Sequence, residues 1–434
     1  MALASRLLAP IAHMRTKLKT PRMEMAHDGV MQPLHTLRAV PQPSVPVNLH
    51  EHEAELTIPC PDPTAEERAR DVHQMRGQKL ARLEDWDKLT AEIATADAER
   101  EKTPGGMPVA EILAFGARND VVNAAEHALM NGRPAHDAPL MAGIEALEHV
   151  LSEHPENPAL ASIVALAHVD LGWAWRGTAW KIEVPARNLE AFSAHFDRAG
   201  SILAVCDATS LDSPLVAAAK CALSAARTSS TRQVAREFET WVNLDPRNGR
   251  AYRAFGAQML PRWNGSYDQL ELEARRTAGR MHDIWGAGAY AWTMFDAISG
   301  DTEACARVDL EFFLDGLRDI LRHSTDQHTV NLLLAYCANT MGATQTGNDE
   351  ADYVRAQIAQ AAHWIVRDHL TELHPMLWAH AARGFDNALR VRSPERFAAS
   401  GHSDAMHFLR SVFRRELSAG KQVVFSQGGL EVVA

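Results

Sequence analysis

The chain has 434 residues, of which 46% are hydrophobic and 23% charged, and its formal net charge is −11. This composition is typical of a soluble globular protein, and the acidic balance argues against sequence-independent binding of nucleic acid, which needs basic surface. Five scattered cysteines without a CxxC pair argue against a disulfide framework or a zinc site and favour a reducing cytoplasm.

Residues 1–63 are predicted to form a disordered or extended N-terminal arm. The first 23 residues carry five Lys or Arg side chains and no acidic one, and residues 24–63 are rich in proline. A disordered basic tail is the favoured interpretation of residues 1–23, and an organelle-type presequence or a membrane-surface anchor are the alternatives. The proline-rich part is expected to be a mobile linker or an extended arm.

An ordered helical body is predicted to begin at Thr64. Thr64 and Glu67 have the spacing of a capping box, which satisfies the first free amides of a helix. This helix is expected to end near Gly77. A second helix follows, with an apolar stripe that includes Leu80, Leu83, Trp86, Leu89 and Ile93. The sequence TPGGMP then interrupts the chain, so the segment indicates a helical hairpin.

The same pattern recurs along the rest of the body. Apolar residues at three- and four-residue steps predict helices at 140–151, 159–175, 230–244, 249–260, 267–282, 287–299, 302–322, 326–342, 350–370, 376–391 and 403–418. The apolar segment 159–175 contains His168 and Asp170, so it is predicted to be a buried core helix rather than a membrane span. Strand character is confined to residues 419–434, where a small hairpin or a loose tail is expected. The body at 64–418 is therefore predicted to be all-α.

Two joints between helices share one arrangement, at Leu151–Leu166 (LSEHPENPALASIVAL) and at Leu244–Gly256 (LDPRNGRAYRAFG). In each joint a proline prevents the preceding helix from continuing, and an asparagine two residues later is suited to a left-handed or turn conformation. Leu160 and Ala161 in the first joint, and Ala251 and Tyr252 in the second, follow five and six positions after the proline, and Val164 or Phe255 follows at nine.

The second joint resembles the junction between tetratricopeptide repeats (TPRs), and the matching residues are Pro246, Asn248, Ala251, Tyr252, Phe255 and Gly256. The resemblance implies that the aromatic residue fills the space between adjacent hairpins and that the glycine lets two helices approach closely. Pro155 and Pro246 are 91 residues apart, which is not a multiple of the 34-residue TPR period.

We therefore predict an irregular, TPR-like α-solenoid of stacked helical hairpins. Each hairpin is expected to bury its apolar face only against the neighbouring pair, which gives a curved rod without a central sheet. The stretch LPRWNGSYDQL at 260–270 resembles, more loosely, an uncharacterised family of bacterial helical-repeat proteins.

Candidate chemistry is sparse in this sequence. His363, His369, His374 and His380 are spaced by six, five and six residues and form no HExxH unit, so polar surface histidines are favoured over a metal site. No phosphate-binding loop, GxSxG motif or diagnostic cysteine nucleophile is found. We therefore predict no catalytic, cofactor-binding or metal-binding residue.

Two aromatic stretches are candidates for binding. In GWAWRGTAW the indole rings surround Arg176 and either line a cleft or fill the space between hairpins, and in PRWNGSYD two aromatic residues flank a turn. The structural role is favoured for both stretches. The best candidates for partner contacts are Trp173, Trp175, Arg176, Tyr252, Trp263 and Tyr267.

The leading hypothesis is a non-catalytic adaptor or scaffold that binds a protein partner through a helical-repeat groove. The alternative is a helical enzyme or small-molecule sensor whose pocket uses the tryptophans and histidines. A cytoplasmic location is expected, with a peripheral membrane or organelle location through residues 1–23 as the alternative. The arm could instead contact a sister subunit, in which case the protein would be a homo-oligomer.

Overall fold

The computed structural model describes residues 56–129, 133–134, 140–177, 184–226, 230–263, 265–342, 345–383 and 393–433. The basic segment 1–23 and most of the predicted arm lie outside these ranges, as do Trp180 and Asn264.

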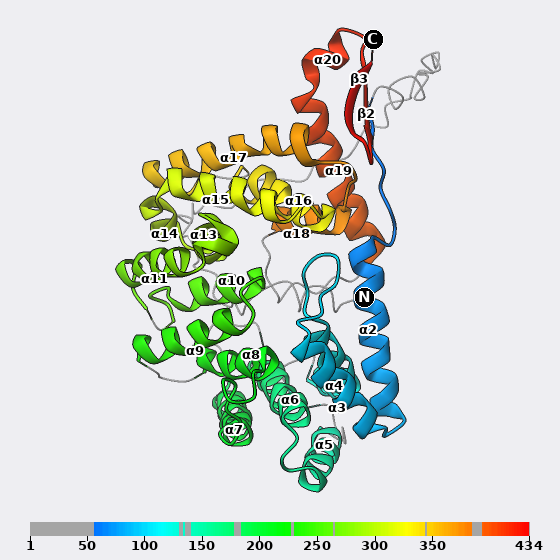
Figure 1. Cartoon of the computed structure of the whole chain (residues 1–434), viewed down its shortest axis with the longest axis vertical. Helices are drawn as coiled ribbons and strands as arrows, with labels where there is room; N and C mark the ends of the chain where they lie inside the picture. Colours follow the sequence, from blue (N-terminus) through cyan, green and yellow to red (C-terminus); the bar gives the residue numbers. More distant parts are fainter. Residues whose placement is uncertain are drawn as a thin grey trace, which may run out of the picture.

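Within the described residues the fold is all-α apart from one small sheet, as the sequence predicts (Figure 1). The helices are α2 (Ala65–Arg82), α3 (Trp86–Ala98), α4 (Val109–Ala128), α5 (Ala142–Glu153), α6 (Pro158–Arg176), α7 (Ala186–Leu203), α8 (Pro214–Ala222), η2 (Leu223–Ala225), α9 (Thr231–Leu244), α10 (Gly249–Gln258), α11 (Tyr267–Arg280), α12 (His282–Trp285), α13 (Gly288–Gly300), α14 (Thr302–Arg307), α15 (Leu310–His323), α16 (Gln327–Ala335), η3 (Tyr336–Met341), α17 (Asp349–His369), α18 (Pro375–Arg383), α19 (Pro394–Val412) and α20 (Arg414–Ser418). The strands are β1 (Leu56–Thr57), β2 (Gln422–Ser426) and β3 (Gly429–Val433).

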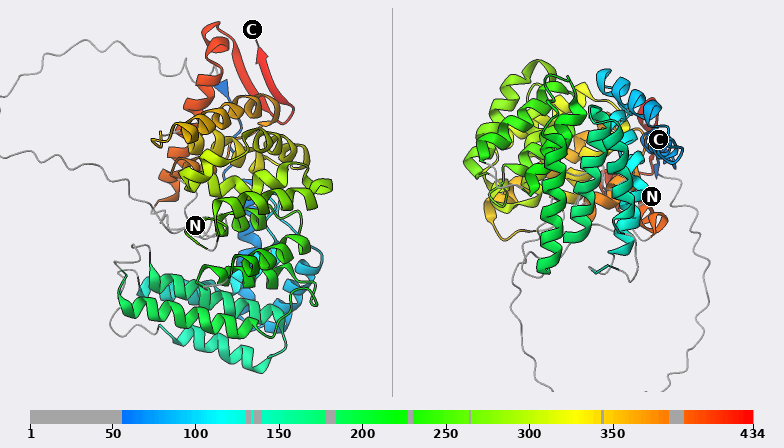
Figure 2. Two further views of the ribbon diagram at one scale, coloured as in Figure 1. Left: turned by 90° about the vertical axis from the view of Figure 1, so that its left-hand side faces the viewer. Right: turned by 90° about the horizontal axis from the view of Figure 1, so that it is seen from below.

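Consecutive helices lie side by side along much of the chain. Helices α5 to α7 lie at one end of the molecule, α9 to α13 follow, and α15 to α19 lead to the sheet at the other end (Figures 1 and 2). Helix α2 packs on α4, α6 on α7, α10 on α13 and α18 on α19.

The first helix begins as predicted but ends later. Thr64 and Glu67 form a capping box, in which the Thr64 amide donates to Glu67 Oε2 at 2.8 Å. The helix runs through Gly77 to Arg82, so the predicted end near Gly77 is wrong. A Cβ atom at Gly77 would lie 2.1 Å from the Leu113 carbonyl oxygen of α4, and one at Gly116 would lie 2.1 Å from the Gln74 carbonyl oxygen of α2. The two glycines therefore allow α2 and α4 to cross at close distance.

The asparagines of the two joints are N-caps. Asn248 Oδ1 accepts from the Arg250 amide at 3.2 Å, and Asn157 Oδ1 accepts from the Ala159 and Leu160 amides at 3.1 Å. Both residues have negative φ, −94° and −85°, which excludes the left-handed one of the two expected conformations. Their side chains instead satisfy the free amides at the start of α10 and α6.

The aromatic residue and the glycine of the second joint lie inside the protein. Tyr252 is fully buried, and its hydroxyl donates to the Pro246 carbonyl oxygen at 2.6 Å. A Cβ atom at Gly256 would lie 1.7 Å from the carbonyl oxygen of Thr293 on α13. The close approach of α10 and α13 therefore depends on the absence of a side chain at Gly256.

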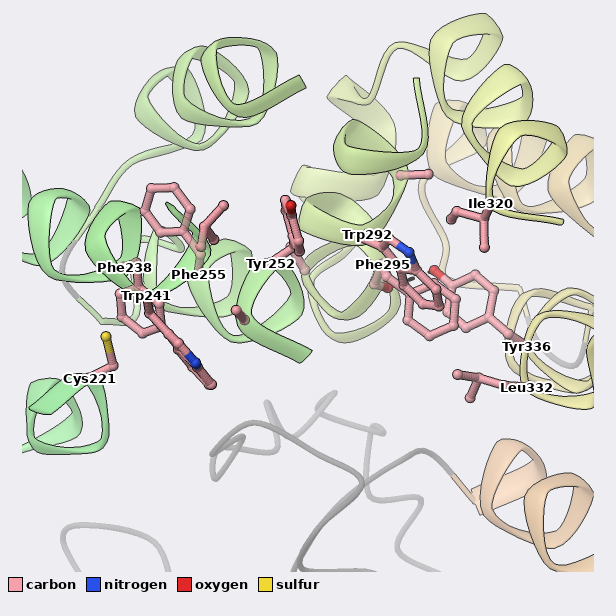
Figure 3. Close-up of a cluster of buried hydrophobic side chains, with 14 of the residues drawn as sticks. Cys221, Phe238, Trp241, Tyr252, Phe255, Trp292, Phe295, Ile320, Leu332 and Tyr336 are labelled. Atoms are coloured by element: carbon pink, nitrogen blue, oxygen red, sulfur yellow. Dashed lines mark hydrogen bonds between the residues drawn. The ribbon is translucent and has the colours of Figure 1, made fainter. Parts of the chain in front are cut away.

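The aromatic core continues on both sides of Tyr252 (Figure 3). On one side, Phe238 and Phe255 stack with ring centroids 5.5 Å apart, and on the other, Phe295 and Tyr336 stack at 3.8 Å. These rings come from α9, α10, α13 and η3, so one apolar core joins several successive hairpins.

Contacts between distant parts of the chain correct the expectation that each hairpin packs only on its neighbours. The segment between α3 and α4 reaches the end of α9, where Lys102 Nζ lies 2.7 Å from Asp245 Oδ1 and Arg100 Nε donates to the Leu244 carbonyl oxygen at 3.1 Å. Glu111 on α4 pairs with Arg250 on α10 at 2.5 Å. The first helices are therefore bound directly to the middle of the chain.

The sheet joins the two ends of the described chain. Strand β1 pairs in parallel with β2, with Leu56 opposite Val423, and β2 forms an antiparallel hairpin with β3. The Leu373 amide also donates to the Pro59 carbonyl oxygen at 2.8 Å. Part of the segment that we assigned to the arm therefore belongs to the same sheet as the C-terminal hairpin.

Helix α6 is long and apolar enough by length and composition to cross a membrane, and 67% of its apolar window is buried inside the protein. That burial is typical of a core helix of a folded domain.

We expect the substitution Gly256→Ala to lower the free energy of unfolding by at least about 2 kcal/mol, because the new methyl group overlaps the Thr293 carbonyl oxygen and α10 must move away from α13. Urea denaturation monitored by circular dichroism measures the change. Gly279→Ala is the matched control, since Gly279 is exposed on α11 and a Cβ atom there meets nothing within 4 Å. The control should be neutral or stabilising by up to about 1 kcal/mol. Equal effects of the two substitutions would contradict the close-crossing role.

Candidate functional site

Four helices enclose a cleft of about 690 Å³ at the end of the molecule where α5 lies. Helix α2 contributes its last turn, α3 its first turn, α4 its middle, and α5 residues along most of its length. The volume falls in the usual range of about 300–1,000 Å³ for binding sites in proteins.

The cleft has an apolar floor. Leu147 is buried with 5% of its surface exposed, while Trp86, Val121 and Val150 are half-buried and pack against the core. Trp86 was expected in the apolar stripe of the second helix, and it does contact the core with part of its ring system. A half-buried indole at the floor of a cleft is a typical anchor for a binding partner.

Charged side chains surround this floor. Arg82 donates to both carboxylate oxygens of Asp120, with Nε–Oδ2 at 2.6 Å and Nη2–Oδ1 at 2.9 Å, and this guanidinium holds the pKa of Asp120 below its ordinary value. Glu84, Asp85 and Asp87 are exposed at the turn between α2 and α3. The signal in the sequence that marks this site is an indole within a run of carboxylates at a helix start.

Helix α5 is held in place by Glu148, on the side of the helix toward α6 and α7. Arg198 on α7 donates to both Glu148 oxygens, at 2.8 and 2.6 Å, and His168 Nε2 on α6 lies 2.7 Å from Glu148 Oε1. The Arg198 hydrogen bonds are the main cause that lowers the pKa of Glu148. Glu148 therefore positions one wall of the cleft although it does not line the cleft.

His168 continues this network to a second histidine. Its Nδ1 lies 2.9 Å from His195 Nδ1, and both rings are buried. Since the Glu148 carboxylate accepts from His168 Nε2, His168 Nδ1 is the acceptor and His195 Nδ1 carries the proton when both rings are neutral. Burial, and then the neighbouring His168, lower the pKa of His195 to about 4. Burial also lowers the pKa of His168.

The predicted contact residues at the end of α6 pack on α7. Trp173 meets Phe192 and Phe196 with ring centroids 5.1 and 6.0 Å away, and the Arg187 guanidinium lies 5.8 Å from the Trp175 ring centroid. The half-buried Arg176 donates to the Gly177 carbonyl oxygen at 2.9 Å, and burial lowers its pKa.

The other three predicted contact residues lie elsewhere. Tyr252 is part of the core and has no exposed surface for a partner, so its assignment to a groove is corrected. Trp263 and Tyr267 are half-buried, and the Arg307 guanidinium of α14 lies 5.0 Å from the Tyr267 ring centroid. The six predicted residues therefore contact different helices, and none of them lines the cleft between α2 and α5.

The four clustered histidines of the sequence also separate. His363 is exposed and His369 half-buried on α17, while His374 and His380 are buried near α18. The ring of His374 lies 6.2 Å from that of His328 on α16. Burial and the positive charge of Arg70 lower the pKa of His380 to about 4. Among the residues that the structure describes, no three His, Cys, Asp or Glu side chains are placed to hold a metal ion.

No protein-family model, curated protein or solved structure matches this chain. The candidate site is therefore defined by its geometry.

We expect the histidine pair to make the protein less stable in acid. His195 has a lower pKa in the folded chain, about 4, than the ordinary value of 6.5. The unfolded chain therefore binds more protons between these values, and stability falls as the pH drops from about 6.5 to about 4. The full shift corresponds to about 3 kcal/mol.

The variant His195→Asn tests this, because the Asn amide can still donate to His168 but does not titrate. Urea denaturation at pH 7 and at pH 4 should show a smaller loss of stability in this variant than in the wild type. His149→Gln removes an exposed histidine and serves as the control, which should follow the wild type. Parallel pH profiles for wild type and His195→Asn would show that the pair does not cause the acid sensitivity.

Proposed function

We propose that this chain is a non-catalytic adaptor, a degenerate TPR-like α-solenoid that binds a protein partner in the cleft between α2 and α5. The observation that carries the proposal is the half-buried Trp86 on an apolar floor that charged side chains surround. Protein interfaces concentrate their binding energy in such aromatic anchors, with a polar rim around them.

The ion pair in the cleft favours a structural role for Asp120 over a catalytic one. The pKa of Asp120 is lowered by Arg82, which moves it away from neutrality. A general acid or base works best with a pKa near the operating pH. The Asp120 carboxylate instead ties the wall formed by α4 to the end of α2.

A cytoplasmic location is part of the proposal. Cys206, Cys221, Cys305 and Cys337 are buried free thiols, and burial raises the pKa of each. Free buried thiols are typical of proteins in a reducing compartment.

The alternative of a small-molecule sensor has one supporting observation. Nδ1 of His374 and Nε2 of His380 are buried and make no hydrogen bond with any part of the chain that the structure describes. A rise in the melting temperature with a small molecule, lost in the variant His380→Phe, would favour this function over the adaptor.

The substitution Trp86→Ala should strongly weaken partner binding while the chain stays folded. Affinity capture from the native cells identifies proteins that bind the wild type, and binding is then repeated with the purified partner. Truncation of an aromatic anchor should weaken the affinity by about thirtyfold or more.

Tyr353→Ala is the matched control, because Tyr353 is an aromatic residue with 61% of its surface exposed on α17, away from the cleft. Partners that bind wild type, Trp86→Ala and Tyr353→Ala equally would rule out the cleft as the docking site.

A further inference from the structure

The cleft between α2 and α5 carries an excess of negative charge. Its side chains include five carboxylates and one arginine, Arg82, which is paired with Asp120. Glu84, Asp85 and Asp87 form no ion pair with any residue in the described ranges. These three side chains follow one another at the rim beside Trp86, so an occupant that anchors on the indole meets them directly.

The C-terminal end of one helix adds to this negative potential. Helix α2 ends at Arg82 and α5 ends at Glu153, and both ends border the cleft. The last carbonyl groups of α2 accept hydrogen bonds from the following turn and its last turn is basic, so the end of α5 is the one that matters here. The C-terminal end of a helix carries a partial negative charge, and the last turn of α5 holds no basic residue to offset it. The opposite charge at the start of α3 is offset by Asp87 in its first turn.

The backbone around the cleft restricts the form of the occupant. Most of the lining residues belong to helices, and in the turn between α2 and α3 the Glu84 and Asp85 amides donate to the Ala81 and Leu80 carbonyl oxygens at 3.1 Å. The walls therefore offer no strand edge with which an extended peptide could pair. An occupant that buries its backbone here must satisfy its own hydrogen bonds, and a helix does so.

From these observations we propose that the cleft binds a lysine- or arginine-rich amphipathic helix of a partner protein. The apolar face of that helix packs on Trp86, Leu147 and Val150, and its basic side chains pair with Glu84, Asp85 and Asp87. The inference rests on the proposed docking function and names the class of partner that the cleft selects.

Binding of designed peptides to the full-length chain tests the proposal. Three fluorescent 18-residue amphipathic helices share an apolar leucine face and differ in the polar face, which is lysine, glutamine or glutamate. We expect the lysine peptide to bind at least tenfold more tightly than the glutamine peptide, and the glutamate peptide to bind most weakly. The affinity of the lysine peptide should also fall as salt is raised.

Two variants locate the binding on the protein. The triple variant Glu84→Gln, Asp85→Asn, Asp87→Asn should lower the affinity for the lysine peptide by about tenfold. The matched control neutralises three exposed or half-exposed carboxylates on other helices, Asp268→Asn, Glu303→Gln and Asp315→Asn. If the control weakens binding as much as the triple variant, the general acidity of the chain attracts the peptide and the inference is wrong.

The chain's own basic segment is the competing occupant. Residues 1–23 contain Arg6, Arg15, Lys17, Lys19 and Arg22. A full-length variant with all five changed to Gln should bind the lysine peptide with unchanged affinity. A clear gain in affinity would show that this segment occupies the cleft and would overturn the assignment to a partner.

The outcomes separate this inference from the proposed function. If the lysine and glutamine peptides bind equally and Trp86→Ala weakens both, the cleft still binds helices, but the proposal that it selects a basic helix is wrong. Binding of the lysine peptide that Trp86→Ala leaves unchanged would overturn both. Preference for lysine that depends on Trp86 and on the three rim carboxylates supports both.

Discussion

The crossing of α2 over α4 is the constraint on which the candidate site depends. Gly77 and Gly116 each lie against a carbonyl oxygen of the opposite helix, so the two backbones approach more closely than any side chain at these positions would allow. Arg82 of α2 and Asp120 of α4 lie beyond this crossing, toward the cleft, and form an ion pair. The position of the cleft therefore follows from a contact in which no functional side chain takes part.

The opposite wall of the cleft is held by polar contacts. Helix α5 buries only Ile144 and Leu147, so its apolar contribution is small. The hydrogen bonds of Glu148 with His168 on α6 and with Arg198 on α7 add the polar contacts that hold this helix in place. Close backbone packing thus fixes one wall, and a partly buried network that contains titrating histidines fixes the other. The α5 wall is therefore the more sensitive of the two to pH.

The sequence predicted the class of fold because three- and four-residue spacing reports a buried helix face directly. The resemblance to a TPR junction also implied the close helix approach at Gly256, which the Thr293 carbonyl oxygen confirms. It failed at Gly77, because the same residue type also ends helices, and only the facing Leu113 carbonyl oxygen distinguishes the two roles. The pairing of Lys102 with Asp245 could not be predicted, because a charged residue in a loop does not indicate its partner 143 residues away.

The site was harder to predict than the fold. Periodicity shows which face of a helix points inward, but it does not show whether a neighbour covers that face. Trp86 was therefore assigned to the core, although part of its surface lines the cleft. Tyr252 was assigned to a groove because it is aromatic, whereas its hydroxyl finds a buried partner at Pro246. The predicted contacts at Trp173, Trp175, Arg176, Trp263 and Tyr267 stay predictions.

The pairing of β1 with β2 has a consequence for how the chain comes apart. In an open array of helical hairpins the end units have one neighbour each, and they can fray while the middle stays folded. Here Leu56 pairs with Val423 in the neighbouring strand, the loop before α4 is joined to the end of α9, and α4 itself is joined to α10. Neither end can unfold alone without loss of contacts, because loss of structure at one end removes contacts at the other. These contacts between the two ends couple their unfolding, which favours one cooperative transition over stepwise unfolding from the ends.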